Sequence, residues 1–310
     1  MISETPIVIA FTPNYFVPAA TTILSILQHT TPSERLHIIV LLSEELPERM
    51  KDKLSILGKE RVRYTYLNLQ GRLGEVYVDE RYTEAASYRL LLPNLLPDYD
   101  KVIYIDCDII VRNDIVKLYQ HTHLDDNYLA GVYEAPLDFQ KSRFESLGCN
   151  PKEYINSGFL LMNLAQLRKD DMVNKMLKAL NVDYLEFPDQ DVINQTCKGR
   201  IVALPPYYNS IRTFFLPQYK EAFTQQYSEE EWHEVQQHGT IHYTGGKPWN
   251  LFTVGFLSWW NCYEQLPQCI KEEWQVNKKM LRLYKVYKTR IGKAFIDGAQ
   301  TIYRKLRYRK

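Results

Sequence analysis

Short apolar runs alternate with amphipathic segments along the first 115 residues of the chain. The expected strands are Pro6–Phe11, Leu36–Leu42, Val62–Leu67 and Lys101–Ile105. Apolar residues recur at helical spacing between them, over Val17–Leu27, Pro47–Leu57 and Ala85–Leu92. Strands that alternate with helices in this way are typical of a parallel sheet covered by helices on both faces. Because ligands gather at the carboxyl ends of such strands, we expect the chemistry of this chain there.

The pattern becomes mixed beyond residue 120. Tyr128–Tyr133 and Ser157–Met162 resemble strands, Leu164–Leu180 has the spacing of one helix, and the polar segment Glu221–Gln237 is predicted at the surface. Gln70–Ser87 lacks apolar periodicity and is predicted to be a long surface loop, of the kind that often covers a site. The simplest division is a catalytic α/β domain over residues 1–265 and a helical appendage over residues 266–310.

Charge is distributed unevenly, although the net charge of the chain is only +1. Residues 278–310 hold twelve Lys or Arg side chains and one acidic residue, Asp297, which leaves 26 basic and 36 acidic side chains for the other 277 residues. Apolar side chains recur in this basic tail near helical spacing. They are Met280, Tyr284, Tyr287, Ile291, Phe295, Ile302 and Leu306.

A basic amphipathic helix with aromatic residues suits an anionic membrane surface, so we expect the tail to attach the protein there. The alternative is a helix that packs on the domain and keeps a solvated face. Nucleic acid is not an expected partner, because no recognition module accompanies the charge.

The five cysteines form no CxxC pair, a pattern typical of reduced thiols in a cytosolic protein. The first residues lack the basic segment and cleavage site of a signal peptide. Residues 5–33 carry no charged side chain, but proline and polar residues interrupt them too often for a membrane span, and a buried strand and helix explain them better. We therefore expect a cytoplasmic protein, peripheral at the inner face of the cell membrane.

Two carboxylates, Asp106 and Asp108, end the apolar run KVIYIDCDIIV at residues 101–111. Side chains at i and i+2 of extended backbone point the same way, so both can reach one cation. A divalent metal relieves the cost of placing two like charges in an apolar setting, and oxygen ligands suit Mg²⁺ or Mn²⁺. The same spacing occurs at Asp98/Asp100, predicted to lie in a solvated loop, and at Asp189/Asp191. Spacing alone therefore leaves a structural role open.

Four motifs in order are more specific than this pair. They are SYRLLLPNLLPDYDKVIYIDCDIIV at residues 87–111, YINSGFLLMNL at 154–164, PDQDVIN at 188–194 and IHYTGGKPW at 241–249. Together they resemble glycosyltransferase family 8, the retaining enzymes that include bacterial lipopolysaccharide galactosyl- and glucosyltransferases. The resemblance implies the GT-A fold, a nucleotide-sugar-binding mixed α/β sheet flanked by helices, and a UDP-sugar donor.

The resemblance also implies roles for particular residues. Asp106, Asp108 and His242 match metal ligands, with Mn²⁺ the expected ion and Mg²⁺ the other candidate. Donor contacts are implied at a second set of positions. These are Ala10, Phe11, Thr12, Asn14, Tyr15, Arg89, Cys107, Asn156, Ser157, Gly245 and Lys247.

Asp189, Gln190 and Asp191 match residues beside the transferred sugar. Gln190 lies at the position beneath C1, but an amide is a poor nucleophile, so a front-face reaction is favoured and Asp191 is the alternative nucleophile. Several residues to which the resemblance gives a role also have a structural interpretation. These are an exposed helix arginine for Arg89, a turn residue for Asn156, a surface turn for the Gly245–Lys247 loop, and a helix start for Asp189 and Asp191. Family members often have an aspartate where this chain has Thr12, which weakens the inference that the base is uracil.

The sequence therefore predicts a metal-assisted, retaining hexosyltransferase that moves galactose or glucose from a UDP-sugar to a cell-surface glycan or lipid-linked acceptor. A catalytically degenerate sugar-nucleotide-binding or membrane-attached scaffold protein remains an alternative. A sugar nucleotidyltransferase is a weaker one, because AFTPNYFVPAATT has no glycine-rich basic loop after the first strand.

Overall fold

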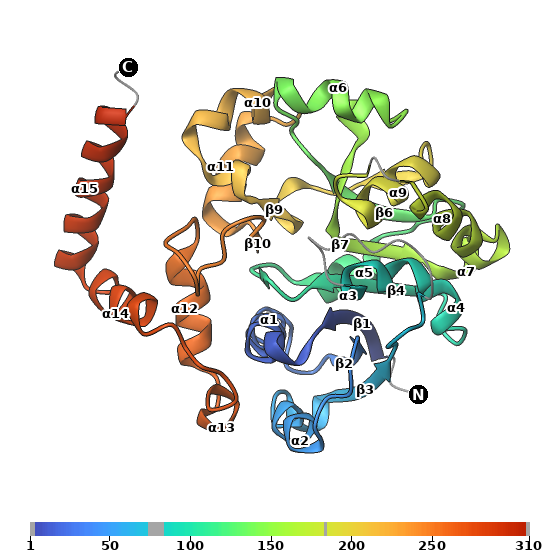
Figure 1. The fold of residues 1–310 in the computed structure, drawn as a ribbon, viewed down its shortest axis with the longest axis horizontal. Helices are drawn as coiled ribbons and strands as arrows, with labels where there is room; N and C mark the ends of the chain where they lie inside the picture. The colour runs from blue at the N-terminus through green and yellow to red at the C-terminus, as the bar shows by residue number, and fades with distance from the viewer. Residues whose placement is uncertain (1–3, 74–83, 183–184, 308–310) are drawn as a thin grey trace.

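The structure is a computed structural model that describes residues 4–73, 84–182 and 185–307, the side chains of 299–307 excepted. Seven of the described strands form one sheet in the order β3-β2-β1-β4-β7-β6-β8, and three short strands form a second in the order β5-β10-β9 (Figure 1). The large sheet contains β1 (Glu4–Phe11), β2 (Arg35–Leu42), β3 (Val62–Asn68), β4 (Lys101–Asp106), β6 (Leu129–Tyr133), β7 (Ile155–Asn163) and β8 (Ile201–Ala203). The small sheet contains β5 (Ile109–Ile110), β9 (Ser210–Ile211) and β10 (Ile241–His242).

The first four strands of the large sheet, β3, β2, β1 and β4, are parallel, as the alternating pattern predicts. β7 runs antiparallel to both β4 and β6, so the sheet is mixed. Side chains of β1 alternate between two cores: Ile7 and Ile9 lie in one, and Val8 and Ala10 in the other. Burial on both faces explains why these strands read as continuous apolar runs.

Helices cover both faces of the sheet. One core includes side chains of α1 (Phe16–His29), α2 (Glu48–Ser55) and α12 (Phe256–Glu264). The other includes side chains of α4 (Leu92–Leu95), α7 (Leu164–Lys169), α8 (Met172–Leu180) and α9 (Pro188–Thr196). The remaining helices are α3 (Glu84–Ser87), α5 (Ile115–His121), α6 (Asp138–Ser146), α10 (Lys220–Thr224), α11 (Glu229–His238), α13 (Gln268–Lys271), α14 (Lys278–Tyr287) and α15 (Arg290–Arg307).

The single helix predicted over Leu164–Leu180 is wrong, because α7 and α8 are separated at Asp170 and Asp171. Asp171 has a φ of +51°, outside the helical region. The carboxylate of Asp170 accepts hydrogen bonds from the Tyr128 hydroxyl at 2.9 Å and from Arg200 at 2.7 Å. These long-range bonds stabilise the break, and apolar spacing alone gives no sign of them.

Three other segments differ in part from the sequence interpretation. Residues 84–87 of the predicted loop Gln70–Ser87 form α3, while residues 74–83 lie outside the described residues. The expected helix Ala85–Leu92 is split into α3, a 3-10 turn over Tyr88–Leu91 and α4. Glu221–Gln237 is mostly at the surface, but Phe223, Trp232 and Val235 are buried against the core.

The basic tail forms two helices, where one was expected. α14 ends at Tyr287 and α15 begins at Arg290, where the Thr289 hydroxyl accepts the Gly292 backbone N–H at 3.0 Å. Figure 1 shows both at one edge of the molecule, with α15 standing away from the sheet. Ile302 and Leu306 fall among the residues whose side chains are not described. Among the described helices, none has the length and hydrophobicity needed to span a bilayer.

Candidate metal and donor-sugar site

Three potential metal ligands meet where the two sheets adjoin. Asp106 is the last residue of β4, and Asp108 follows in the turn that leads into β5. His242 ends β10, which pairs with β5 so that His242 lies opposite Ile109. His242 Nε2 is therefore 3.4 Å from Asp108 Oδ1 and 3.8 Å from Asp106 Oδ2. One ligand atom from each residue lies within 4.8 Å of the others.

In both Asp106 and His242, one polar atom is held by hydrogen bonds to neighbouring residues, and the other points toward the remaining ligands. Asp106 Oδ1 accepts hydrogen bonds from Arg89 at 2.8 Å and from the Tyr104 hydroxyl at 2.9 Å, which leaves Oδ2 toward His242. His242 Nδ1 lies 3.0 Å from Asn209 Oδ1. Since that oxygen can only accept, Nδ1 carries the proton and Nε2 keeps its lone pair for a cation.

A glycine keeps this space open. A Cβ atom at Gly158 of β7 would lie 2.3 Å from His242 Cε1 and 2.7 Å from Asp106 Oδ2. Two carboxylates and one neutral imidazole are a donor set suited to a divalent cation such as Mn²⁺ or Mg²⁺. The residues present therefore fit the expected metal, and Asp98 and Asp100, which share the spacing, are exposed loop residues as predicted.

Lys247 reaches the same cluster from the loop after β10. Its ammonium donates to the Asp108 carboxylate and, at 2.8 Å, to the Tyr243 carbonyl oxygen. Burial opposes ionisation of Asp108, but the positive charge of Lys247 holds the pKa of that carboxyl well below its usual value. Gly245 begins the turn with a φ of +88°, a conformation that glycine adopts without strain. The loop therefore places the ammonium group of Lys247 beside the carboxylate of Asp108, and it is not a plain surface turn.

Arg89 connects the carboxylates of two motifs. Its side chain is buried, and its guanidinium lies 2.8 Å from Asp106 Oδ1 and 3.1 Å from Asp189 Oδ2. It also donates to the backbone carbonyl of Ser157 at 2.5 Å. Burial disfavours the charged form of Arg89, yet Asp106 and Asp189 raise its pKa above the usual value. The interpretation of Arg89 as an exposed helix arginine is therefore wrong.

Gln190 and Asn156 form an amide cluster beside the metal ligands. Gln190 Oε1 accepts from Asn156 Nδ2 at 3.1 Å and from the Ser157 backbone N–H at 3.0 Å. Gln190 Nε2 donates to Glu134 and to the Tyr154 hydroxyl, both at 3.3 Å. Burial raises the pKa of Glu134, and its bonds to Asn156 and Gln190 offset part of that rise. These bonds fix the orientation of the Gln190 amide.

Asp189 and Asp191 have different surroundings, although both lie in the first turn of α9. Asp189 accepts from the Ser157 hydroxyl at 3.0 Å and pairs with Arg89, and burial raises its pKa. Asp191 is fully buried, and both of its oxygens accept from Arg143, at 2.7 and 2.6 Å. Further donors to Asp191 are the Tyr154 hydroxyl and the backbone N–H groups of Glu186 and Phe187.

The end of β1 lies beside these ligands, because Ala10 is in register with Asp106. Phe11 is buried, Thr12 hydrogen-bonds Asn14, and the Tyr15 ring meets the Trp249 ring edge-on at 5.9 Å. Burial raises the pKa of Tyr15, and nearby Lys247 partly offsets this. The carbonyl oxygens of Cys107 and Ile109 both accept from the Thr22 hydroxyl, at 3.0 and 2.9 Å, which anchors the turn that carries Asp108.

Comparison with known proteins identifies the family. Residues 6–252 match the family described as "Glycosyl transferase family 8". The chain is a member of glycosyl transferase family 8. It is similar to lipopolysaccharide glucosyltransferase WaaO of Escherichia coli K12, at 28% identity over 247 residues, which are 76% of this chain and 70% of WaaO. It is also 30% identical over 180 residues to general stress protein A of Bacillus subtilis 168, covering 55% of this chain and 61% of that protein.

Solved structures confirm the expected fold. The galactosyltransferase LgtC, in complex with donor and acceptor sugar analogues, superimposes with a TM-score of 0.72 at 22% identity, covering 87% of this chain and all of LgtC. The bifunctional WbbM glycosyltransferase gives a TM-score of 0.74 at 22% identity and covers 88% of this chain, although the chain spans only 52% of WbbM. The mixed sheet with flanking helices is the GT-A fold of this family.

Four residues around the family 8 motifs were missed by sequence reasoning: Asn209, Glu134, Gly158 and Thr22. Asn209 and Thr22 act through hydrogen bonds to distant segments, so their own neighbourhoods carry no signal. Glu134 directly follows β6, and a search for polar residues at strand ends would have found it. Gly158 lies inside the INSGF motif, and a glycine within an apolar strand often marks a close approach of other groups.

Proposed function

We propose that this chain is a metal-assisted hexosyltransferase that moves galactose or glucose from a UDP-sugar to a cell-surface glycan or lipid-linked acceptor. The observation that carries the proposal is the convergence of Asp106, Asp108, His242 and Lys247 at the carboxyl end of β4. The names of two similar proteins, a lipopolysaccharide glucosyltransferase and a galactosyltransferase, support a hexose donor and a glycan acceptor.

Each group has a task in this proposal. Asp106, Asp108 and His242 would hold a divalent cation, which neutralises charge on a departing diphosphate. Lys247 supplies a second positive charge from the loop after β10, and ordered donors aimed at developing charge are effective because they need no reorganisation. The Thr12–Tyr15 segment and Cys107 lie where the nucleoside would bind, and Asn156, Asp189 and Gln190 line the place of the sugar.

Transfer with retention of configuration would proceed without a covalent bond to Gln190 or Asp191. The Gln190 amide is a poor nucleophile, and its oxygen and nitrogen are both engaged. Asp191 is held by Arg143 and by backbone N–H groups at the start of α9, so we assign it a positioning role. The geometry favours a front-face reaction, in which the leaving phosphate helps to deprotonate the acceptor hydroxyl.

A survey of nucleotide sugars tests the donor assignment. Thermal unfolding would be followed with UDP-glucose, UDP-galactose, GDP-mannose and ADP-glucose, each with and without Mn²⁺. We expect one UDP-hexose to raise the melting temperature, and only when Mn²⁺ is present. Metal-dependent stabilisation without turnover of that donor would favour the degenerate scaffold protein, and stabilisation by no nucleotide sugar would contradict the proposal.

Asn209 is expected to position His242 for the metal. Asn209→Ala should weaken Mn²⁺ binding by about 10- to 100-fold, the usual cost of losing such a partner. Calorimetry on the full chain measures this, and the KM for the donor should rise as well, because Asn209 also donates to Asn156 Oδ1 at 2.9 Å. Asn113→Ala is the matched control, because Asn113 donates to the Tyr207 and His238 carbonyls, in the segments that precede β9 and β10, and makes no hydrogen bond to the three metal ligands. Unchanged Mn²⁺ affinity in Asn209→Ala would refute the role.

We also propose that residues 266–310 form an appendage that attaches the enzyme to the inner face of the cell membrane. Lys285, Arg290 and Lys293 are exposed on α14 and α15, beside the exposed apolar side chains of Ile291 and Phe295. Reversing these three charges to Glu should reduce co-sedimentation with anionic vesicles severalfold, without changing the melting temperature. Equal co-sedimentation of the variant and the parent protein would favour a tail that only packs on the domain.

A further inference from the structure

A groove of about 450 Å³ lies between the segment after β9, the loop that leads into α12 and the end of α14. Most of the residues that line it have apolar side chains, and polar side-chain and backbone atoms are exposed between them. The apolar residues include Phe215, Leu216, Phe252, Phe256, Leu257 and Tyr287. This volume falls in the range of sites that bind small molecules, roughly 300–1,000 Å³. The groove is separate from the carboxylates of the metal site, and the proposed chemistry does not use it.

One end of the groove adjoins the metal site. Arg212 lines this end and directly follows Ile211, which pairs with His242 across β9 and β10. The backbone N–H of Arg212 donates to the Thr244 hydroxyl at 3.2 Å, in the loop that carries Lys247. The guanidinium of Arg212 is exposed and has no hydrogen-bond or ion-pair partner among the residues that the structure describes. The groove therefore presents an available cation next to the site.

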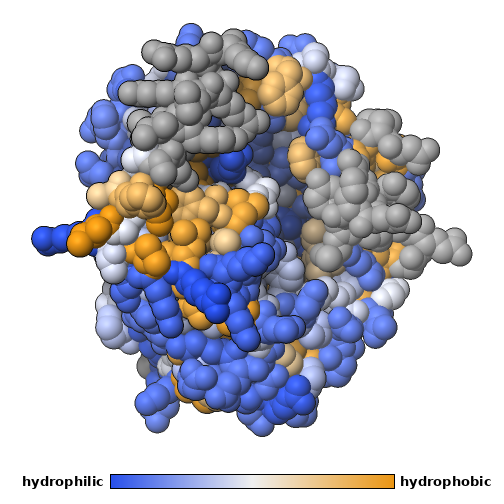
Figure 2. Space-filling model, turned by 60° about the vertical axis from the view of Figure 1, so that its left-hand side comes forward, coloured by the Kyte–Doolittle hydropathy of each residue, from blue (hydrophilic) through white to orange (hydrophobic). Residues whose placement is uncertain are grey.

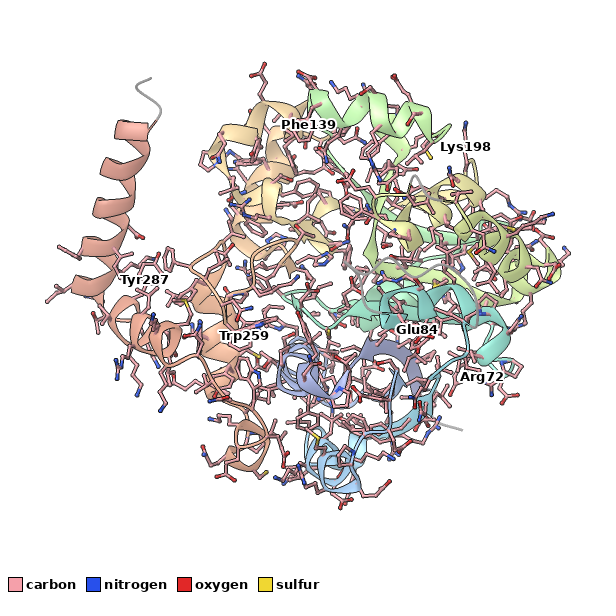
Figure 3. All side chains as sticks on the ribbon, viewed as in Figure 1. Arg72, Glu84, Phe139, Lys198, Trp259 and Tyr287 are labelled. Atoms are coloured by element: carbon pink, nitrogen blue, oxygen red, sulfur yellow. The ribbon has the colours of Figure 1, made fainter. Side chains whose placement is uncertain are left out.

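The other end of the groove opens at the basic tail. Tyr287 packs edge-on against Phe252 at 4.9 Å, and its hydroxyl donates to Asp297 of α15 at 2.7 Å. Figure 3 labels Tyr287 where α14 meets α15. Just beyond it, Ile291 and Phe295 are 86% and 76% exposed. Figure 2 shows apolar side chains gathered on one face of the molecule, beside a central hollow. The groove thus connects the apolar side of the tail with the neighbourhood of His242.

We infer that this groove receives the phosphate-bearing apolar chain of a lipid-linked acceptor. The apolar side chains of the groove would contact the chain, Arg212 would pair with the phosphate, and the tail would hold the protein at the surface from which the lipid comes. A neutral saccharide would need several side chains that form hydrogen bonds, and besides Arg212 the groove offers Thr253 and Ser258. The inference rests on the proposed function, which includes a lipid-linked acceptor, and specifies where that lipid binds.

Dodecyl phosphate below its micelle-forming concentration is a suitable probe for the full-length protein. Calorimetry should show binding that weakens at least tenfold in Arg212→Glu, and also in Val254→Trp, which fills the groove without changing its charge. Arg282→Glu makes the same charge change on the exposed surface of α14, outside the groove, and should bind like the parent protein. Dodecyl maltoside and inorganic phosphate, which each lack one half of the probe, should bind much more weakly.

Two results would overturn the inference: dodecyl phosphate that binds Arg212→Glu and Val254→Trp as well as the parent, or either half-probe that binds as tightly as dodecyl phosphate. Stabilisation by the UDP-sugar and Mn²⁺ is measured on the same variants. If the UDP-sugar and Mn²⁺ still stabilise the protein but the substitutions do not affect probe binding, only the inference about the groove is contradicted. If the UDP-sugar and Mn²⁺ do not stabilise the parent protein, the proposed function is contradicted.

Discussion

Asp106→Asn and Asp108→Asn should each reduce turnover of the UDP-sugar by about 100- to 1,000-fold. Metal ions commonly stabilise transition-state charge by several kcal/mol, and about 1.4 kcal/mol corresponds to a factor of ten in rate. Asp106→Asn removes the negative charge opposite Arg89 and His242, and Asp108→Asn removes the one beside Lys247. Steady-state kinetics and Mn²⁺ titration of both variants measure the loss.

Asp98→Asn and Asp100→Asn are the matched controls for this pair. They carry the same substitution at the same spacing, on an exposed turn one strand earlier. We expect normal turnover and normal Mn²⁺ affinity from both. Melting temperatures show whether a loss at Asp106 or Asp108 comes from unfolding, because Arg89 and Lys247 each lose an ion-pair partner. Full activity in Asp106→Asn or Asp108→Asn would remove the basis of the metal assignment.

Gly158→Ala should weaken metal binding strongly although it adds a single methyl group. The new Cβ would lie 2.3 Å from His242 Cε1 and 2.7 Å from Asp106 Oδ2, so close that one of these atoms would have to move. Both neighbours are held from behind, His242 by Asn209 and Asp106 by Arg89, so neither can move away freely. We expect Mn²⁺ affinity to fall by at least about tenfold, as it does when the partners of metal ligands are removed.

Gly131→Ala separates this local effect from a general cost of adding a methyl group to the sheet. Gly131 lies on β6, and its Cβ would meet Ile155 and Leu160 side chains at 3.0 and 3.3 Å, away from the metal ligands. Overpacking of this kind costs roughly 1–3 kcal/mol of stability. The variant should therefore melt earlier yet bind Mn²⁺ normally. Normal Mn²⁺ binding by Gly158→Ala would show that the space beside Gly158 is not the metal site.

The strands around the site could be predicted from sequence because they are buried on both faces. Residues such as Ile38 and Ile103 have no exposed side, so their strands read as apolar runs with polar ends. Asp106 was found in this way, since a carboxylate at the end of such a run is conspicuous. His242 was found only through its motif, because the pairing of β5 with β10 joins residues more than 130 positions apart.

Helix ends and side chains that depend on hydrogen bonds between distant segments could not be predicted in the same way. The end of α7 depends on bonds from Tyr128 and Arg200 to Asp170, and no local pattern at residue 170 records them. The role of Asn209 likewise depends on its contact with a histidine 33 residues away. Periodicity reports which side of an element is buried, whereas hydrogen bonds between distant segments decide which polar side chains complete a site.

The most direct test of the proposed chemistry is hydrolysis of UDP-glucose and UDP-galactose by the full-length protein after treatment with a chelator. The account predicts almost no release of UDP by the chelated enzyme and recovery on adding Mn²⁺ for the parent protein and Asp98→Asn, but not for Asp106→Asn. Release of UDP that is unaffected by the chelator, or recovery in Asp106→Asn equal to that of the parent, would contradict a metal-assisted reaction at this site.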